Sequence, residues 1–270
     1  MNERYIENKR GKTYYWTAGD GSDCVVFLHG ATADHLLFKY QFDFFKSDFR
    51  VIAIDAPLHG ESKPYTNFSL GNASKELKNI LDKEQVNKAH LVGQSMGGLI
   101  SQIFVREYPE RVNSIILVGS TPLFPQYYTK IDIFLLKITP WLLYLYPYNF
   151  LIKSIANQVS VTEEGKKYMF DTLKKHSIHE LVRITRGVFS EFSNYLNNKL
   201  LEAPIFITHG DKDITGKVQA YCKRWSDEEK LPLTIIPNAA HNANMDNPDF
   251  FNKLLKDILN NGIYSREWLE

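Results

Sequence analysis

Short apolar runs recur along the chain, and helical patterns separate most of them. The later runs are apolar on both faces of an extended chain, which is typical of parallel strands covered by helices on each side. These runs are residues 50–55, 89–92, 114–118, 204–208 and 232–236. Between runs, residues 97–108 and 250–259 have helical spacing and end near Pro109 and Gly262. This alternation predicts a doubly wound α/β sheet.

The beginning of the chain carries a different signal. Two apolar runs, residues 13–17 and 25–28, flank the turn Gly19-Asp20-Gly21-Ser22. A glycine-rich turn between two such runs is typical of a hairpin. The sheet is therefore expected to start with antiparallel strands.

Residues 121–198 interrupt the alternation. They contain no convincing strand, but residues 131–138, 163–175 and 179–195 have helical patterns. We interpret the segment as a helical cap inserted over one end of the sheet. The expected division is a core of residues 1–120 and 199–270 with a cap of residues 121–198.

Charge and cysteine content narrow the function classes. Lys and Arg total 32 against 31 Asp and Glu, a formal net charge of +1, and like charges form no long runs. Over the whole chain this balance provides no field strong enough to gather nucleic acid or anionic lipid, and no nucleic-acid partner is expected. Cys24 and Cys222 form no C-x-x-C pattern, and Cys24 is expected to fill the core. The polar start of the chain lacks the apolar stretch of a signal peptide, so a cytoplasmic location is expected.

One segment, residues 131–152, is rich enough in Leu, Phe, Tyr and Trp to require a membrane test. It carries Asp132 and Lys137 and is interrupted by Pro140 and Pro147. A spanning helix needs about 20 mostly uncharged apolar residues. The segment fails this test, and no stable membrane insertion is expected.

The strongest chemical signal is Gly93-Gln94-Ser95-Met96-Gly97, a G-x-S-x-G sequence. It follows the predicted strand 89–92 and opens the predicted helix 97–108, which is the context this motif requires. Such a turn is so tight that its neighbouring positions must be small, and it holds the serine hydroxyl at the N-terminus of a helix. Ser95 is therefore the candidate nucleophile.

A serine hydroxyl needs a base to remove its proton, and that base needs an acid to orient it. Of eight histidines, His241 lies in a loop after the final predicted strand, where the chain order Ser…Asp…His places the base. Asp211 and Asp213 both follow the penultimate strand. We favour Asp213 as the acid, and Asp211 is expected to cap the turn or meet solvent.

A tetrahedral oxyanion needs two hydrogen-bond donors. The backbone N–H of Met96, directly after the nucleophile, is one candidate. The sequence His29-Gly30-Ala31 ends an early strand, and the N–H of Ala31 is the second candidate by its position.

Together these motifs resemble the α/β-hydrolase superfamily. The likeness rests on residues 28–31, 55–62, 93–98, 108–112, 210–213 and 240–241, in this order along the chain. It implies a mostly parallel eight-stranded sheet, and it is similar to the branch with a cap inserted after the sixth strand. Asp55, His59 and Ser62 then belong to a structural turn. The sequence departs from the pattern at Ala240, where glycine is frequent, and at Lys217, where proline is often found.

The resemblance implies a serine hydrolase that cleaves a small, apolar carboxylic ester or related acyl compound through an acyl-enzyme. Relatives that hydrolyse haloalkanes or epoxides carry aspartate where this chain has Ser95, so neither reaction is expected. Hydrolysis of a C–C bond beside a ketone and a non-turnover receptor or signalling protein stay open as alternatives. No cofactor is expected, and no metal-ligand spacing is present.

The cap carries the remaining substrate information. Its aromatic and aliphatic residues either hold the cap on the sheet or face an apolar substrate, and the sequence does not decide between these roles. They are Phe124, Tyr127, Tyr128, Phe134, Trp141, Leu142, Tyr144 and Phe150. The oligomeric state is left open.

Overall fold

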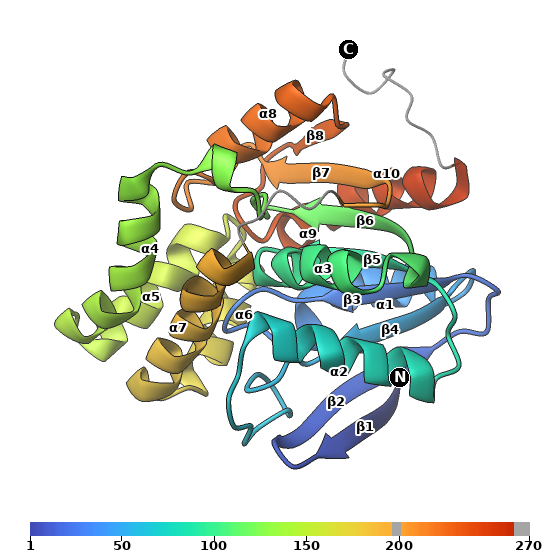
Figure 1. Cartoon of the computed structure of the whole chain (residues 1–270), viewed down its shortest axis with the longest axis horizontal. Helices are drawn as coiled ribbons and strands as arrows, with labels where there is room; N and C mark the ends of the chain where they lie inside the picture. The colour runs from blue at the N-terminus through green and yellow to red at the C-terminus, as the bar shows by residue number, and fades with distance from the viewer. Residues whose placement is uncertain (196–200, 262–270) are drawn as a thin grey trace.

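The computed structural model describes residues 1–195 and 201–261, which form one sheet between two layers of helices (Figure 1). The sheet has eight strands in the order β1-β2-β4-β3-β5-β6-β7-β8. The strands are β1 (Asn2–Asn8), β2 (Gly11–Ala18), β3 (Cys24–Leu28), β4 (Arg50–Ile54), β5 (Ala89–Gln94), β6 (Val112–Val118), β7 (Ile205–Gly210) and β8 (Leu233–Ile236). Strands β3 to β8 pair in parallel, whereas β1 and β2 are antiparallel. The predicted fold class is confirmed.

The predicted hairpin between residues 13–17 and 25–28 is wrong. Strand β2 pairs with β1 on one side and with β4 on the other, and β3 lies beyond β4. The turn at residues 19–22 therefore connects β2 to β3 past β4, and does not join two adjacent strands. The antiparallel start is present, but its hairpin partner is β1, a strand that the apolar pattern did not predict.

Both faces of the sheet are covered, which explains why the central strands are apolar throughout. Val25 and Phe27 of β3 pack in one core cluster with α1 (Lys39–Phe45) and α10 (Pro248–Asn261). Val26 and Leu28 of the same strand pack in a second cluster on the opposite face with α2, α3 and α8. These helices are α2 (Leu70–Lys83), α3 (Met96–Glu107) and α8 (Val218–Glu229).

Helix α2 was not predicted, although its signals are present in the sequence. The side chain of Ser69 caps the helix by accepting a hydrogen bond from the backbone N–H of Asn72. Leu70, Leu77 and Ile80 then follow at helical spacing and are buried.

Four helices lie between β6 and β7, at one end of the sheet (left in Figure 1). They are α4 (Lys130–Leu142), α5 (Tyr148–Val159), α6 (Glu163–Lys174) and α7 (Ile178–Tyr195), with the short 3-10 helix η4 (Leu143–Leu145) between α4 and α5. Three correspond to predicted helical stretches, whereas α5 was not predicted. The proposed cap boundary at residues 198 and 199 lies outside the described residues.

Candidate active site

Ser95 lies in the turn that joins β5 to α3. Its backbone adopts φ 49° and ψ −112°, a conformation that costs free energy in any residue other than glycine. The backbone N–H of Ser95 donates to the carbonyl of Val118 at 2.9 Å, and the hydroxyl of Ser120 donates to the carbonyl of Ser95 at 2.9 Å. These two hydrogen bonds to the end of β6 stabilise the turn.

The tightness of this turn explains Gly93, whereas Gly97 lies against the backbone of Leu28 in β3. A Cβ atom on Gly93 would lie 2.5 Å from the carbonyl carbon of Gly97 and 2.5 Å from the amide nitrogen of Gly98. No side chain fits at that distance from backbone atoms. The motif thus follows from the steric demands of a strand that reverses directly into a helix.

His241 and Asp213 lie side by side on the loops after β8 and β7. The Nδ1 atom of His241 is 2.8 Å from Oδ2 of Asp213, and both side chains are buried. Burial opposes ionisation of Asp213, but the hydrogen bond and charge of His241 outweigh it and lower the pKa of Asp213. An ionised carboxylate accepts hydrogen bonds only, so Nδ1 of His241 carries a proton, and in the neutral form of the ring Nε2 is then an acceptor.

Two neighbours fix the imidazole in place. The side-chain amide of Gln94, the residue before Ser95, donates to the carbonyl of His241 at 3.0 Å. On the other side, a Cβ on Gly119 would lie 3.0 Å from Nδ1 of His241 and 3.3 Å from Oδ2 of Asp213. Gln94 thus connects the turn that carries Ser95 to the loop that carries His241.

Asp246 is a buried carboxylate that the sequence reasoning missed. Its Oδ2 atom accepts from the backbone N–H groups of Ala240 and Val161, each at 3.0 Å, and Oδ1 accepts from the hydroxyl of Thr162 at 2.9 Å. The residue therefore ties the loop of His241 to the turn between α5 and α6. The only local signal is an acid a few residues after the candidate base.

Asp211, the alternative acid, has a different contact. Its Oδ1 atom accepts from the backbone N–H of Ala239 at 2.9 Å, and the residue is exposed. It braces the turn between two loops, whereas Asp213 contacts His241.

Ala31 and Met96, the two candidate oxyanion donors, line the same cavity as Ser95 and His241. Neither backbone N–H donates to an acceptor among the described residues. Unsatisfied N–H groups beside a cavity are available to a ligand oxygen.

This cavity has a volume of about 560 Å³, within the usual range for small-molecule sites. It lies between the carboxyl ends of the strands and the inserted helices. Its wall is mainly apolar and includes Leu99, Leu135, Ile155, Met169, Val188 and Phe189. The arrangement suits a ligand with an apolar body whose reactive group lies beside Ser95.

The eight aromatic and aliphatic residues singled out from the sequence fall into three groups. Tyr128 lines the cavity. Phe124 and Tyr127 are buried against Trp225 and hold the start of the insertion on the core. The other five are exposed: Phe134, Trp141, Leu142, Tyr144 and Phe150.

The charged side chains of the cavity wall neutralise each other. Nζ of Lys217 is 2.7 Å from Oδ1 of Asp132. The hydrogen bond from Lys217 is the largest cause of a pKa of Asp132 far below the ordinary value, followed by hydrogen bonds from Thr129. Asp132 lies in the first turn of α4 and Lys217 precedes α8, so the ion pair also joins the insertion to the core.

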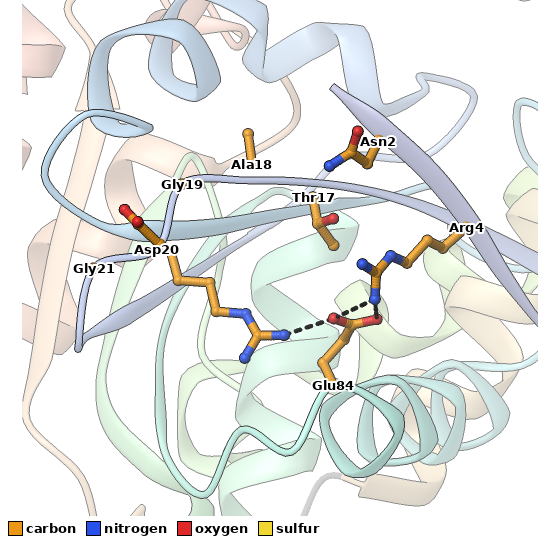
Figure 2. A pocket seen from close by; sticks show the side chains of 9 residues that line it. Asn2, Arg4, Thr17, Ala18, Gly19, Asp20, Gly21 and Glu84 are labelled. Atoms are coloured by element: carbon orange, nitrogen blue, oxygen red, sulfur yellow. Dashed lines mark hydrogen bonds and ion pairs between the residues drawn. The ribbon is translucent and has the colours of Figure 1, made fainter.

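A second cavity, of about 370 Å³, lies at the opposite edge of the sheet near β1 and β2. Figure 2 shows Glu84 beside Arg4, and Arg50 contacts the same carboxylate at 2.6 Å. The buried carboxylate of Glu84 neutralises one of the two arginine charges and holds both side chains in place. We assign this cluster a structural role in holding β1 and β4 to the end of α2.

Within residues 1–195 and 201–261, no three His, Cys, Asp or Glu side chains are arranged to hold a metal ion. None of the helices in these ranges combines the length and apolar character needed to cross a bilayer.

Comparison with known proteins places the chain among related hydrolases. A family model described as "alpha/beta hydrolase fold" matches residues 23–248. A 2-hydroxy-6-oxononadienedioate/2-hydroxy-6-oxononatrienedioate hydrolase of Comamonas testosteroni is 28% identical, covering 97% of this chain and 95% of the relative. Human epoxide hydrolase 4 is 24% identical, covering 94% of this chain and 77% of that protein.

A solved structure of a thermophilic esterase from Thermogutta terrifontis has the same fold. It matches with a TM-score of 0.78 at 17% identity, covering 96% of this chain and 98% of the esterase. Since the family model matches most of the sequence, the chain belongs to the alpha/beta hydrolase fold family.

Proposed function

We propose that the protein is a serine hydrolase that cleaves a small, largely apolar carboxylic ester or related acyl compound. The observation that carries this proposal is one cavity that contains Ser95, held in a strained turn, together with His241, whose ring is hydrogen-bonded to buried Asp213. A hydroxyl, a base and an orienting carboxylate are the parts that nucleophilic acyl transfer requires.

In this mechanism Nε2 of His241 takes the proton of Ser95 as the hydroxyl oxygen attacks the acyl carbon. The tetrahedral oxyanion accepts hydrogen bonds from the N–H groups of Met96 and Ala31. The intermediate expels the alcohol, which receives the proton from His241, and leaves an ester on Ser95. A water molecule that loses a proton to His241 then releases the carboxylic acid and restores the serine.

The substrate class follows from the cavity wall. The described lining is mostly aliphatic and aromatic, and Lys217 is engaged by Asp132. Transfer of a charged group into such a cavity costs free energy unless it is paired. A neutral acyl compound with an apolar chain or ring therefore fits better than a dianion.

Hydrolysis of a C–C bond is the second candidate. The Comamonas testosteroni relative, which is named for a dioate substrate, matches nearly the full length of both chains. A dioate needs two cationic partners, whereas Lys217, the one Lys or Arg in the described lining, is paired. Ester hydrolysis is therefore the first proposal.

Despite the similarity to epoxide hydrolase 4, we do not propose epoxide hydrolysis for this chain. A serine that opens an epoxide forms an ether, which water does not cleave, whereas a carboxylate forms an ester, which it does. With Ser95 at this position, turnover of epoxides through a covalent intermediate is not expected.

The test uses a fluorophosphonate probe and a panel of nitrophenyl esters of increasing chain length. We expect Ser95 to be labelled and the longer apolar esters to be hydrolysed, with Ser95→Ala slower by about 10⁴-fold or more. The variant keeps the same backbone demands, so its unfolding transition should match that of the parent.

The other outcomes discriminate between the alternatives. Labelling without turnover of any ester points to the non-turnover receptor. Turnover of a vinylogous diketone in preference to every ester points to the C–C hydrolase. Activity that persists in Ser95→Ala removes the nucleophile from the proposal.

A further inference from the structure

The outer side of the inserted helices exposes an unusual number of large apolar side chains. On α4, η4 and the start of α5, Leu145 is 75% exposed, Ile131 69%, Phe150 60% and Trp141 55%. We define the cap face as the exposed side chains of Ile131, Phe134, Trp141, Leu145, Tyr146 and Phe150. An apolar surface this dense on a folded chain is typical of a binding surface.

The charges around the cap face have one dominant sign. Residues 130–154 contain Lys130, Lys137 and Lys153, all exposed, and one acid, Asp132, which is buried and paired with Lys217. None of the three lysines makes an ion pair with a carboxylate in the part of the chain that the structure describes.

The neighbouring helix α7 adds a basic side chain beside the cap face. Arg186 is exposed, and its guanidinium lies 5.9 Å from the centre of the Trp141 ring, whereas Arg183 donates to the carbonyl of Tyr65 on the core. Glu180, the acid at the start of α7, is half-buried and contacts Lys63 and Ser177. The surroundings of the cap face are therefore basic.

The cap face is continuous with the substrate cavity. Leu135 is itself half-exposed and lines the cavity, and Leu136, Thr139 and Ile155 of the same helices line it too. In Figure 1, α4 and α5 form the left end of the molecule, beyond the ends of the central strands. A flat partner can thus approach this end without contact with the sheet.

We propose that the cap face binds the surface of an anionic lipid bilayer. Helices that lie on membranes combine large apolar side chains with lysine and arginine on their polar side, and Trp and Tyr favour the headgroup level. The basic residues around the cap face complement anionic headgroups. Apolar side chains on α4 and α5 would then lie in the interface, with the cavity mouth beside the lipid.

A second copy of the chain is a poorer occupant. A symmetric dimer places the same patch on both sides, so the lysines of one copy would face those of the other. Like charges across an interface oppose association, whereas a bilayer with anionic lipid supplies the opposite charge.

The proposal does not depend on the proposed hydrolysis, because membrane binding is measured without turnover. Vesicles of phosphatidylcholine and phosphatidylglycerol in a three-to-one mixture, and vesicles of phosphatidylcholine alone, are sedimented with the protein and with Ser95→Ala. We expect both proteins to bind the anionic vesicles equally and the neutral vesicles more weakly. Failure of both to sediment with the anionic vesicles would overturn the proposal, whatever the esterase assay gives.

A matched pair of double variants locates the contact. Trp141→Ser with Leu145→Ser removes the cap face contact and should lower binding by about tenfold or more. The control is Phe44→Ser with Ile235→Ser, which removes exposed apolar side chains outside the cap face. Like Trp141, Phe44 has a cation near its ring, Lys256 at 5.7 Å from the ring centre. Equal losses in the two double variants would overturn the assignment.

Lysine variants test the electrostatic part. Replacement of Lys130, Lys137 and Lys153 by Gln should cost about fivefold per residue on anionic vesicles and little on neutral vesicles. Sedimentation equilibrium of the parent tests the other occupant. A dimer that the Trp141→Ser and Leu145→Ser double variant abolishes, without any vesicle binding, would assign the cap face to a second copy and overturn the proposal.

Discussion

Two buried carboxylates at opposite edges of the sheet show how similar groups serve different purposes. Glu84 accepts hydrogen bonds from Arg4 at 2.8 Å, Arg50 at 2.6 Å and the hydroxyl of Tyr15 at 2.7 Å. Asp213 accepts from Nδ1 of His241 at 2.8 Å and from the backbone N–H of Thr215 at 2.9 Å. One carboxylate has two permanent cations, and the other has a partner that can gain and lose a proton.

The difference teaches which buried acid is fit for chemistry. Glu84 is held by arginines, which stay charged at any physiological pH, so its surroundings do not change. Asp213 stabilises positive charge only when His241 becomes protonated, and His241 lines the cavity with Ser95. Both carboxylates are buried, but only Asp213 has a partner that titrates near neutral pH and lines a cavity.

The largest effect is expected when Asp213 is replaced by Asn. The amide of the variant can donate to Nδ1 of His241 and so favours the wrong tautomer, and we expect kcat for ester hydrolysis to fall by about 10⁴-fold with little change in the unfolding midpoint. Steady-state kinetics and urea unfolding provide the two readings. Asp211→Asn, two residues away, is the control and should stay within about threefold of the parent, since Asp211 does not contact His241. Equal losses in both variants would remove Asp213 from its role.

The G-x-S-x-G turn could be predicted from sequence because its constraint is local. Gly93 is required by contacts with Gly97 and Gly98, a few residues away, and the strands on either side are apolar runs; Gly97 is the exception, because it approaches the backbone of Leu28 in β3. The same holds for the central strands, whose burial on two faces leaves a continuous apolar signal. Local sterics and local apolar patterns therefore suffice for the turn and the sheet centre.

Other features could not be predicted because they depend on distant partners. Strand β1 is mostly exposed and polar, and it is held by pairing with β2 and by the contact of Arg4 with Glu84. The turn at residues 19–22 looks like a hairpin, but nothing local reveals that β4 occupies the place beside β2. Cavity residues such as Met169 and Val188 have the same apolar character as core residues, and only the packing of the inserted helices separates them.

The next largest effect concerns Glu84 and should appear in stability alone. Glu84→Gln leaves two arginines without a carboxylate, and because both are partly exposed we expect a loss of about 2–3 kcal/mol, at the low end for a broken buried pair. Activity per folded molecule should be unchanged. Glu228→Gln is the matched control, because Glu228 pairs with Arg224 on an exposed helix surface, and it should cost at most about 0.5 kcal/mol. Urea unfolding measures the loss of stability, and active-site titration gives the activity per folded molecule.

The stability of the protein at acid pH should reveal part of the contribution that Glu84 makes to the fold. Burial opposes ionisation of Glu84, but hydrogen bonds from Tyr15, Arg4 and Arg50 outweigh it and lower its pKa below the ordinary value of 4.5. Ionised Glu84 therefore stabilises the fold at and above the unfolded-state pKa, and this stabilisation is lost as pH falls through the lower folded-state value.

Urea unfolding of the parent at a series of pH values should show stability falling below about pH 4.5, and more steeply than in Glu84→Gln. Asp213 has a lowered pKa as well, so some acid sensitivity should persist in the variant. Identical pH profiles for parent and variant would contradict the assigned role of Glu84.

The smallest effect is expected for the ion pair of Asp132 with Lys217. The Asp132 side chain is only 9% exposed, but the side chain of its partner Lys217 is 63% exposed. Lys217→Met should lower the free energy of unfolding by less than about 1 kcal/mol, since water replaces an exposed ammonium at little cost. Turnover of neutral esters should change by less than about threefold, because the ion pair does not contact the reacting atoms. Asp132→Asn should cost more than Lys217→Met, since Asp132 also accepts hydrogen bonds from the backbone and hydroxyl of Thr129 at the start of α4. The contrary outcome is that Lys217→Met lowers the free energy of unfolding as much as Glu84→Gln does. In that case the exposure of the cation would not determine how much stability the loss of an ion pair costs in this protein, and the contrast between Glu84 and Asp132 would need another cause.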